Sequence, residues 1–564
     1  MADSLLYQIS ASTELSGEPF IRRENVYIID QNNGSYTNNT VILDCAAVSN
    51  AGKWADFQNA YITVPLCVTM TSTYDFTGVD TDFAVGLKNG FHQLIASVNI
   101  EYNNTSVVQI SNLTNMYISY KLNTSLSVDD VVTFGSQIGF AIDSFQSWSY
   151  RNGPSLNGQG STNNTDNIAQ TNFSLAFQGT SGNIGYGRRQ LDTTFTDNQQ
   201  GVLLLLGAGW DSQSALFTKN FSKKSNYVAN NTTQIWEIIA TIRLKDIADF
   251  FNQMPLVRNA YMKMYLNLNQ SLTTFTITSA TGFVSVLKQN LVVYGGQTNP
   301  LLIASAENNN GLEALSADVV ANGGPTENFV VSVSVLQSLD VAAQNGFNRN
   351  TMLSSCRLYI DLYTMNPDKE VEYLTGRNKT IRYRDIFQYQ LLNVQTAFNS
   401  LISNGISNLK EIVIVPLISS TYNGTGTAAT AFSPLVSPFC SEPASCSPLC
   451  WFNQFNIQIS GVNVFSNTEQ YGFEQYQNEL YGVNSVQGGI VDGMTSGLLS
   501  QIAFYNNYGY LVANVSRRLP EEDRTPKSVQ ISGNVLTQVP LDLYVFCVFE
   551  KSITIDLYTG RRLA

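Results

Sequence analysis

The chain has 564 residues, with 31 Lys and Arg against 43 Asp and Glu, and a net charge of -12. An acidic chain so poor in basic residues lacks the positive surface that phosphate backbones require, which excludes tight nucleic-acid binding. His92 is the single histidine, so multi-histidine metal sites and catalytic schemes within one chain are also excluded. No apolar run reaches the ~20 residues of a membrane-spanning helix, and we expect no signal peptide at the N-terminus.

Strand-like segments follow one another along most of the chain. They are rich in Val, Ile, Tyr, Phe and Thr and are bounded by Asn, Gly, Ser and Pro. Many alternate apolar and polar residues, which is typical of half-buried antiparallel strands, and the absence of βαβ alternation disfavours a parallel sheet. The predicted fold class is therefore all-β. The expected strands are 39–46, 60–70, 94–101, 234–244, 260–269, 329–336, 357–365, 410–418, 456–465, 511–515 and 541–557.

Helical patterns are few and short. One predicted helix includes Leu113 and Tyr120, and a second covers 466–480, where Ser466 and Glu469 have the spacing of a capping box. Residues 245–251 and 397–402 are predicted as single turns or short helices.

An internal repeat indicates two copies of one β module. A hairpin followed by an amphipathic helix occurs at 99–120 and again at 457–476. Upstream, 60–70 is similar to 357–367, and downstream, 260–277 is similar to 541–560. The boundary between copies is expected near 279–300. The long polar segments are expected to project from one end of each sandwich as insertions, and they are 151–201, 305–328 and 419–448.

The candidate chemical groups favour structural roles. His92 stands in NGFHQLIA without local partners for catalysis or metal binding, so we predict a hydrogen-bonded structural histidine. Four cysteines in apolar strands, Cys45, Cys67, Cys356 and Cys547, are predicted to be small buried residues. The loop triplet Cys440, Cys446 and Cys450 has C-x5-C-x3-C spacing, which fits a disulfide or free thiols better than zinc.

Other patterns are equally unspecific. The glycines at 158–160 and 488–489 lack a phosphate-binding context and are predicted turns. The mixed-charge segments 368–385 and 517–527 are either solvated loops or polar subunit contacts. No pair of carboxylates stands out beside aromatic residues, so no catalytic, cofactor-binding or metal-binding residue is assigned. The five tryptophans are scattered rather than forming an aromatic platform, and they are Trp54, Trp148, Trp210, Trp236 and Trp451.

Several segments resemble the double jelly-roll major capsid proteins of the lineage that includes adenovirus-like, virophage and polinton-type viruses, with the polinton and virophage branch most similar. In the first half they are EPFIRRENVYIIDQNNGSYTNNTVILDCAA, AYITVPLCVTM and IRLKDIADFFNQMPLVRNAYMKMYLNL. In the second half they are RLYIDLYTMNPDKEVEYL, KTIRYRDIFQYQLLNV, SNLKEIVIVPLISS, FSPLVSPFCSEPASCSPL, NIQISGVNVFSNTEQYGFEQY, SRRLPEEDRTPKSVQISGN and LDLYVFCVFEKSITIDLYTG.

The resemblance implies two tandem eight-stranded jelly rolls at 21–290 and 291–564, preceded by an N-terminal arm at 1–20. It also implies a non-enzymatic structural protein without cofactors, whose homotrimers form pseudo-hexagonal capsomers that tile an icosahedral virion shell. The implied partners are further copies of the chain, penton proteins and minor or cement capsid proteins, with assembly inside the host cell. Two alternatives stay open. One is a carbohydrate-binding or receptor-binding β protein such as a fibre or lectin, and the other is a β-sandwich hydrolase.

Overall fold

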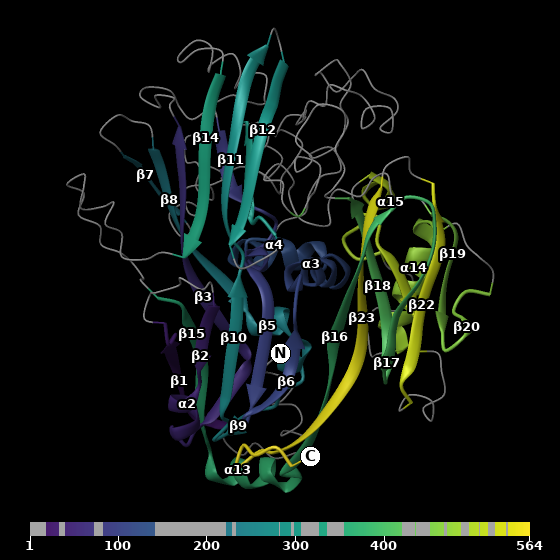
Figure 1. The fold of residues 1–564 in the computed structure, drawn as a ribbon. Coiled ribbons are helices and arrows are strands. Elements are labelled where there is room, and N and C mark those ends of the chain that lie inside the picture. The colour runs from purple at the N-terminus through teal and green to yellow at the C-terminus, as the bar shows by residue number, and fades with distance from the viewer. Residues whose placement is uncertain are drawn as a thin grey trace.

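The computed structural model describes sixteen parts of the chain. They are residues 18–32, 40–72, 83–140, 222–227, 233–280, 283–294, 298–305, 326–335, 355–419, 435, 452–466, 471–486, 496–506, 508–516, 525–536 and 540–563. Two β-sandwiches stand side by side, the first on the left of Figure 1 and the second on the right.

The first sandwich contains two antiparallel sheets that share eight principal strands. One sheet has the order β1-β15-β3-β8 and the other has the order β2-β10-β5-β6. In chain order the eight strands are β1 (Phe20–Ile29), β2 (Thr40–Asp44), β3 (Trp54–Ser72), β5 (Ile95–Tyr102), β6 (Thr105–Ile110), β8 (Thr233–Arg243), β10 (Met262–Leu268) and β15 (Arg357–Met365).

The second sandwich repeats this arrangement. Its sheets have the orders β16-β23-β18-β21 and β17-β22-β19-β20. Its strands are β16 (Asn378–Val394), β17 (Ala397–Ile406), β18 (Leu409–Ile418), β19 (Phe452–Ile459), β20 (Val462–Asn463), β21 (Leu511–Asn514), β22 (Lys527–Val535) and β23 (Leu541–Asp556).

When the eight strands of each sandwich are numbered along the chain, both sandwiches have one sheet ordered 1-8-3-6 and one ordered 2-7-4-5. This is the strand order of a jelly roll, in which two Greek keys wrap around one core. The all-β class and the two tandem jelly rolls predicted from the sequence are therefore confirmed.

The predicted repeat is correct for one of its three pairs of segments. The hairpin β5–β6 is followed by α3 (Thr114–Ser125), and the hairpin β19–β20 is followed by α14 (Phe473–Val486), at the same place in both sandwiches. The other two pairs are wrong. The counterpart of β3 is β18 rather than β15, and the counterpart of β10 is β22 rather than β23. Similar apolar alternation occurs in every strand, so it did not distinguish one strand position from another.

The expected division between the two jelly rolls, at residues 290 and 291, falls inside strand β12 (Phe283–Tyr294). Strand pairing indicates a different division. The later strand β15 pairs with β1 and with β3, so the first sandwich is completed only at Met365. We propose a boundary at residues 366–377, in the segment that contains α13 (Pro367–Tyr373) and η4 (Leu374–Gly376). The expected arm at 1–20 lies almost wholly outside the described residues.

A sheet extension projects from the first sandwich. Residues Trp54–Thr63 of β3 pair with β15, and Leu66–Ser72 of the same strand pair with β14 on that side. The extension is visible at the top of Figure 1. It contains β11 (Gln270–Ala280), β12 and β14 (Thr326–Val335). The remaining strands are β4 (Phe83–Leu87), β7 (Ser222–Tyr227), β9 (Val257–Arg258) and β13 (Leu301–Ser305).

The helices confirm part of the sequence prediction. The helix predicted around Leu113 and Tyr120 is α3, and the turns predicted at 245–251 are α9 (Leu244–Ile247) and α10 (Asp249–Asn252). The helix predicted at 397–402 is wrong, because these residues belong to β17 and pair with β22. The remaining helices of the described chain are α2 (Ala46–Asn50), η1 (Phe91–Leu94), α4 (Val128–Ile138) and α15 (Gln501–Asn506).

The predicted capping box is also wrong, because α14 begins at Phe473, seven residues after Ser466.

The hydrophobic core crosses from one sandwich to the other as one cluster of buried side chains. Strand β10 alternates between buried and half-exposed residues, whereas the first eight residues of β23 are all buried. A strand buried on both faces lies between two layers, so β23 contacts something beyond its own sandwich. The thiols of Cys45, Cys356 and Cys547 are buried, as predicted.

Candidate functional site: the junction between the two sandwiches

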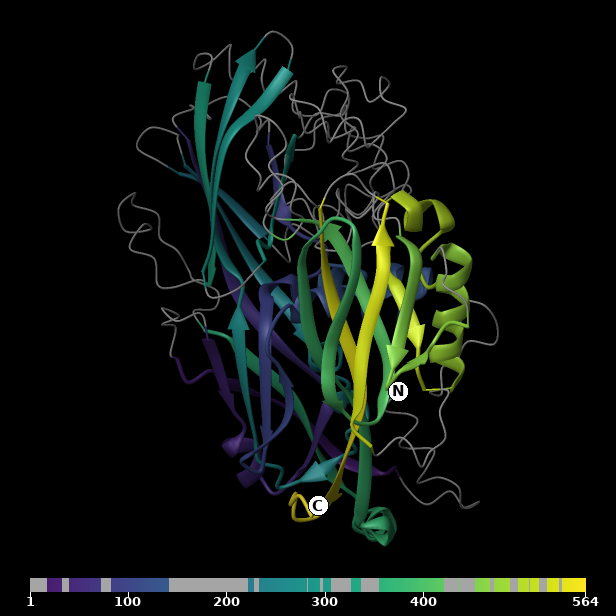
Figure 2. The same cartoon turned by 45° about the vertical axis from the view of Figure 1, so that its right-hand side comes forward.

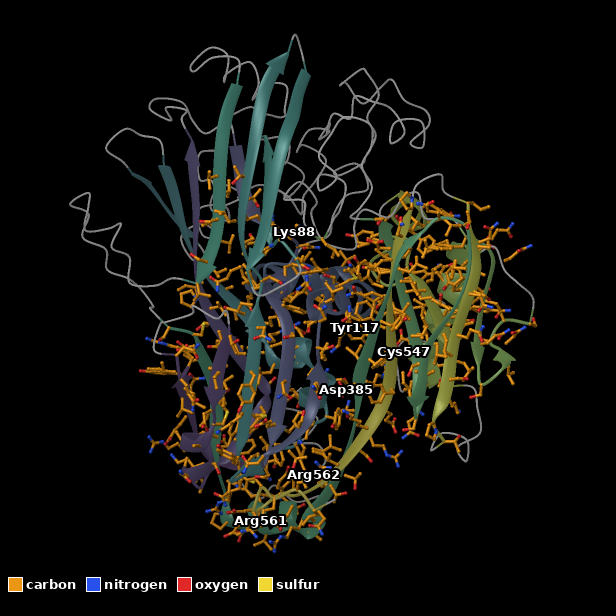
Figure 3. The ribbon with its side chains drawn as sticks, in the orientation of Figure 1. Lys88, Tyr117, Asp385, Cys547, Arg561 and Arg562 are labelled. Carbon is orange, nitrogen blue, oxygen red and sulfur yellow. The ribbon has the colours of Figure 1, made fainter. Side chains whose placement is uncertain are left out.

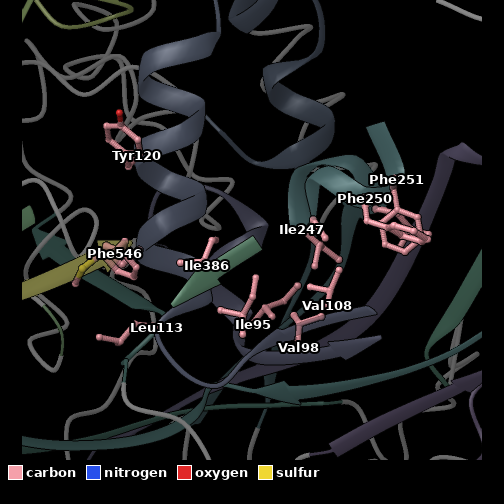
Figure 4. Close-up of a cluster of buried hydrophobic side chains, with 14 of the residues drawn as sticks. Ile95, Val98, Val108, Leu113, Tyr120, Ile247, Phe250, Phe251, Ile386 and Phe546 are labelled. Carbon is pink, nitrogen blue, oxygen red and sulfur yellow. The ribbon is translucent and has the colours of Figure 1, made fainter. Parts of the chain in front are cut away.

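Helix α3 of the first sandwich packs against the second sandwich. The ring of Tyr117 lies 5.7 Å from that of Phe546 on β23, and the ring of Tyr120 meets that of Tyr510 edge-on at 5.2 Å. Figure 4 draws Leu113, Tyr120 and Phe546 in the same buried cluster. Aromatic pairs of this geometry contribute about 0.5–1.5 kcal/mol each beyond the area that they bury. The junction is therefore a packed core rather than a loose contact between domains.

A buried carboxylate lies in this junction. Tyr120 Oη donates a hydrogen bond to Glu411 Oε1 on β18 at 2.5 Å, and Arg384 Nη1 lies 3.9 Å from Glu411 Oε2. Burial raises the pKa of Glu411, while Arg384 and the Tyr120 hydroxyl lower it to a smaller extent. Burial, with the nearby Glu411 charge, also raises the pKa of Tyr120 well above its ordinary value. A buried carboxylate is costly without hydrogen-bond partners, and the Tyr120 hydroxyl on α3 supplies one to Glu411 on β18. This hydrogen bond links the two sandwiches.

Lower in the junction the contacts come from α10 and β16. Phe250 meets Tyr383 edge-on at 5.1 Å, and Tyr383 Oη donates to Val107 O at 2.7 Å. The backbone N–H of Arg384 donates to Asp249 Oδ2 at 3.0 Å. Buried Phe250 thus packs against a strand of the second sandwich, and its neighbour Asp249 holds the backbone of that strand.

At the upper end a turn of the second sandwich docks on α3. The N–H of Leu498 donates to Asn123 O at 2.8 Å, and the Leu498 side chain packs against the small cluster formed by α3 and α4. Gly497 has φ +64°, and a Cβ there would collide with Asn123 O and lie 2.6 Å from Thr124 Cα. Only glycine satisfies both the backbone conformation and the close approach.

Sequence reasoning missed these junction residues. Part of the mixed-charge segment 368–385 lies here, since Arg384 contacts Glu411 and the buried carboxylate of Asp385 pairs with the partly exposed Lys551. Figure 3 labels Tyr117 and Asp385 between the two sandwiches. These charges are therefore contacts within one chain. A signal was available for Glu411, which is the one acidic residue in the largely apolar strand KEIVIVPLI.

The single histidine, His92, is hydrogen bonded, as predicted, and the structure also buries it. His92 Nε2 lies 2.9 Å from Ser119 Oγ of α3 and 3.1 Å from Gln93 Nε2. Gln93 in turn donates to Ser119 Oγ at 2.8 Å and accepts from Asn115 Nδ2 at 2.9 Å. This network holds η1 against α3. Burial lowers the pKa of His92 from 6.5 to about 3.

We expect His92 to stay neutral in the folded protein between pH 7 and pH 4. Because the chain has one histidine, its imidazole nitrogen signals in a ¹⁵N NMR titration are assigned without ambiguity. The unfolded chain takes up this proton below pH 6.5 and the folded chain does not, so acid removes up to about 1.4 kcal/mol of stability per pH unit in this range. A titration midpoint near 6.5 in folded protein would contradict the buried, neutral state.

The other sequence candidates do not form a site in the described chain. Trp54 is buried, and its Nε1 donates to Glu370 Oε1 at 3.2 Å. The Cys440 triplet and three of the tryptophans lie outside the described residues, as do 517–524. Within the described ranges, no group of three His, Cys, Asp or Glu side chains is placed to hold a metal. The same ranges contain no helix long and apolar enough to cross a membrane.

Both sandwiches expose apolar side chains on their first strand, which is an edge strand of its sheet among the described residues. On β1, Tyr27 is 54% exposed, and on β16, Leu392 is 60% exposed. The other exposed apolar residues of these two strands are Ile21, Ile29, Phe387 and Tyr389. Exposed apolar edges favour association with another surface.

No protein-family model matches the chain, and no curated protein matches it. Solved structures of viral particles and capsid proteins do. A chain in the cryo-electron microscopy structure of the Sputnik virophage shares 12% identity, with 98% of this chain and 90% of that chain covered and a TM-score of 0.49. The mavirus major capsid protein shares 10% identity, with 98% of this chain and 92% of that chain covered and a TM-score of 0.47.

The capsid of the virus PBCV-1 contains another similar chain, at 10% identity and a TM-score of 0.40, with 98% of this chain and 99% of that chain covered. Structural similarity to capsid structures thus extends over nearly the whole length of the chain. The jelly-roll assignment itself rests on the strand order of the two sandwiches.

Proposed function

We propose that the protein is a major capsid protein, a non-enzymatic structural subunit that assembles with copies of itself into the shell of a virus particle. The observation that carries this proposal is the pair of jelly rolls with identical strand order, joined through one continuous core. Two similar modules held rigidly side by side present two similar outlines per chain. The resemblance of the sequence to double jelly-roll capsid proteins supports the same role.

We further propose that three chains form a closed ring with six jelly rolls and a pseudo-hexagonal outline, which tiles an icosahedral shell. The exposed apolar residues on the matching edge strands β1 and β16 support contacts between copies. A closed ring removes such edges from solvent, and an obligate interface of this kind buries about 2,000–5,000 Å². Penton and cement proteins would be the further partners, and the virion the location.

The proposal is tested by size-exclusion chromatography with light scattering, followed by negative-stain electron microscopy. From the chain mass of 62.1 kDa, we expect particles with about three times that molar mass and a hexagonal outline. A double variant, Tyr27→Ser and Leu392→Ser, is expected to weaken the trimer without unfolding the chain, because both side chains are largely exposed. A stable wild-type monomer at micromolar concentration would overturn the proposal.

A further inference from the structure

The last strand of the chain ends in a turn that returns to the first sandwich. We call Asp556–Leu563 the C-terminal clasp. The carbonyl oxygen of Gly560 accepts hydrogen bonds from Tyr102 Oη and from Asn103 Nδ2, both at 2.7 Å. Tyr102 is fully buried at the end of β5, so the clasp closes over the base of the first sandwich. Figure 2 shows this turn at the lower end of β23, and Figure 3 labels Arg561 and Arg562 there.

A second strip of backbone of the first sandwich also holds the clasp. The N–H of Arg258 donates to Leu557 O at 2.9 Å, and Asn259 Nδ2 donates to Tyr558 O at 3.1 Å. The guanidinium of Arg258 lies over the ring of Tyr558 at 4.9 Å. The same guanidinium pairs with Glu370 of α13 at 3.0 Å, so Arg258 contacts both the linker that leads into the second sandwich and the clasp that follows its last strand.

The clasp is also joined to the segment that enters the second sandwich. Arg377, directly before β16, donates two parallel hydrogen bonds to Asp556, at 2.8 Å from Nε and 2.6 Å from Nη2. The Arg377 guanidinium holds the pKa of Asp556 well below its usual range. The N–H of Leu557 donates to Arg377 O at 2.9 Å. Bidentate pairs of this kind fix geometry as well as supplying energy.

The fit at Gly560 leaves no space for a side chain. Its φ is +65°, and a Cβ would lie 2.6 Å from Arg258 O and from two backbone atoms of Asn259. All of these atoms are backbone of the first sandwich, so a side chain could be accommodated only by lifting the clasp. Gly461, in the β19–β20 turn, has φ +81° with nothing within 4 Å of its Cβ position. It is a matched control for the backbone conformation alone.

We infer that the C-terminal clasp locks the two jelly rolls into one rigid body and that this lock is required for assembly. The second sandwich begins and ends at the same place on the base of the first. The linker before β16 connects the two sandwiches once, and the clasp after β23 adds a second connection. The residues that follow β23 therefore set the relative orientation of the two sandwiches. The requirement for assembly rests on the proposed capsid function, whereas the lock itself does not.

Two variants of the protein test the lock: a chain truncated after Leu557, and Gly560→Ala. The reporter is hydrogen exchange, followed by mass spectrometry, at the Leu498 amide, which donates across the junction far from the altered residues. We expect this amide to exchange about tenfold faster in both variants, because the junction opens more often. Exchange in β22, inside the second sandwich, is expected to stay at the wild-type rate, as is exchange at Leu498 in Gly461→Ala.

An unchanged rate at Leu498 in both variants would overturn the lock, as would faster exchange in β22 to the same extent, since that indicates general unfolding. Light scattering on the same variants tests the link to assembly, and we expect monomers where the wild type gives trimers. Variants that open the junction and still form trimers would overturn that link. A wild-type protein that remains monomeric would instead overturn the proposed function, and the exchange result would still decide the lock.

Discussion

Replacing Gly497 with alanine is expected to lower the free energy of unfolding by about 3 kcal/mol, within a range of about 2–4. The new Cβ would collide with Asn123 O and Thr124 Cα, which are backbone atoms at the end of α3 and cannot turn away as a side chain would. The positive φ adds about 1 kcal/mol of strain. Urea unfolding monitored by tryptophan fluorescence and by far-UV circular dichroism measures the loss.

Gly461→Ala separates the two causes, because that position has a positive φ and open space around the Cβ. We expect this control to cost only about 1 kcal/mol. The collision also lies between the sandwiches, so Gly497→Ala is expected to split a single unfolding transition into two. Equal losses in the two variants would show that the turn moves freely away from α3 and that the junction is not tightly packed there.

Tyr120→Phe is expected to destabilise the protein by about 2–4 kcal/mol at pH 7, because it removes the hydroxyl that donates to the buried carboxylate of Glu411. The aromatic packing against Tyr510 is kept, so the loss reports the hydrogen bond and not a cavity. Combining Tyr120→Phe with Glu411→Gln in a double-mutant cycle isolates the coupling between the two side chains. A coupling near zero would contradict the role of this pair in joining the sandwiches.

The same pair makes stability depend on pH in a defined direction. The pKa of Glu411 is raised in the folded protein, so the folded chain holds this proton at a higher pH than the unfolded chain does. Its contribution is fully present below the unfolded value of 4.5 and is lost as pH rises through the folded pKa. The pKa of Asp385 is also raised by burial and acts in the same direction, whereas His92 acts in the opposite direction.

The stability difference between wild type and Glu411→Gln removes these other contributions. We expect the free energy of unfolding of the wild type to fall relative to that of the variant as pH rises above 4.5, by up to about 1.4 kcal/mol per pH unit. The groups that face Glu411 from the surrounding elements, Tyr117, Tyr120, Arg384 and Tyr476, are unchanged in the variant. A difference that does not vary with pH would show that Glu411 has the same proton affinity in the folded and unfolded chains.

The rigid junction also bears on how such a subunit meets its neighbours. Contacts made by β1 and β16 of one chain act on one body only if the two sandwiches keep a constant orientation. Variants at Glu411 or Gly497 are therefore expected to affect association as well as folding, although neither residue lies on an exposed edge. This distinguishes them from Tyr27 and Leu392, which are exposed and for which we expect an effect on association alone.

Local sequence indicated many of the strands, the all-β class and the hairpin-helix unit that occurs in both halves, because a period of two residues and turn-forming residues act over short distances. It did not indicate β1, β16 or β22. It also determined that His92 would be hydrogen bonded and that the thiols of Cys45 and Cys547 would be buried. The sequence prediction failed at β17, because the residues AFNSLI also fit a helical turn. In the structure they form a strand paired with β22, and Phe398 and Ile402 pack in the sandwich core.

Only the tertiary structure decided which strands pair. The eighth strand of the first sandwich, β15, begins 89 residues after β10 ends at Leu268, so proximity in sequence did not indicate that β15 pairs with β1 and β3. The junction was equally hidden, because Tyr120 and Glu411 are 291 residues apart and Tyr102 and Gly560 are 458 apart. Contacts between such distant segments leave no periodic trace in the sequence, because they depend on how the two sandwiches bury their facing surfaces against each other.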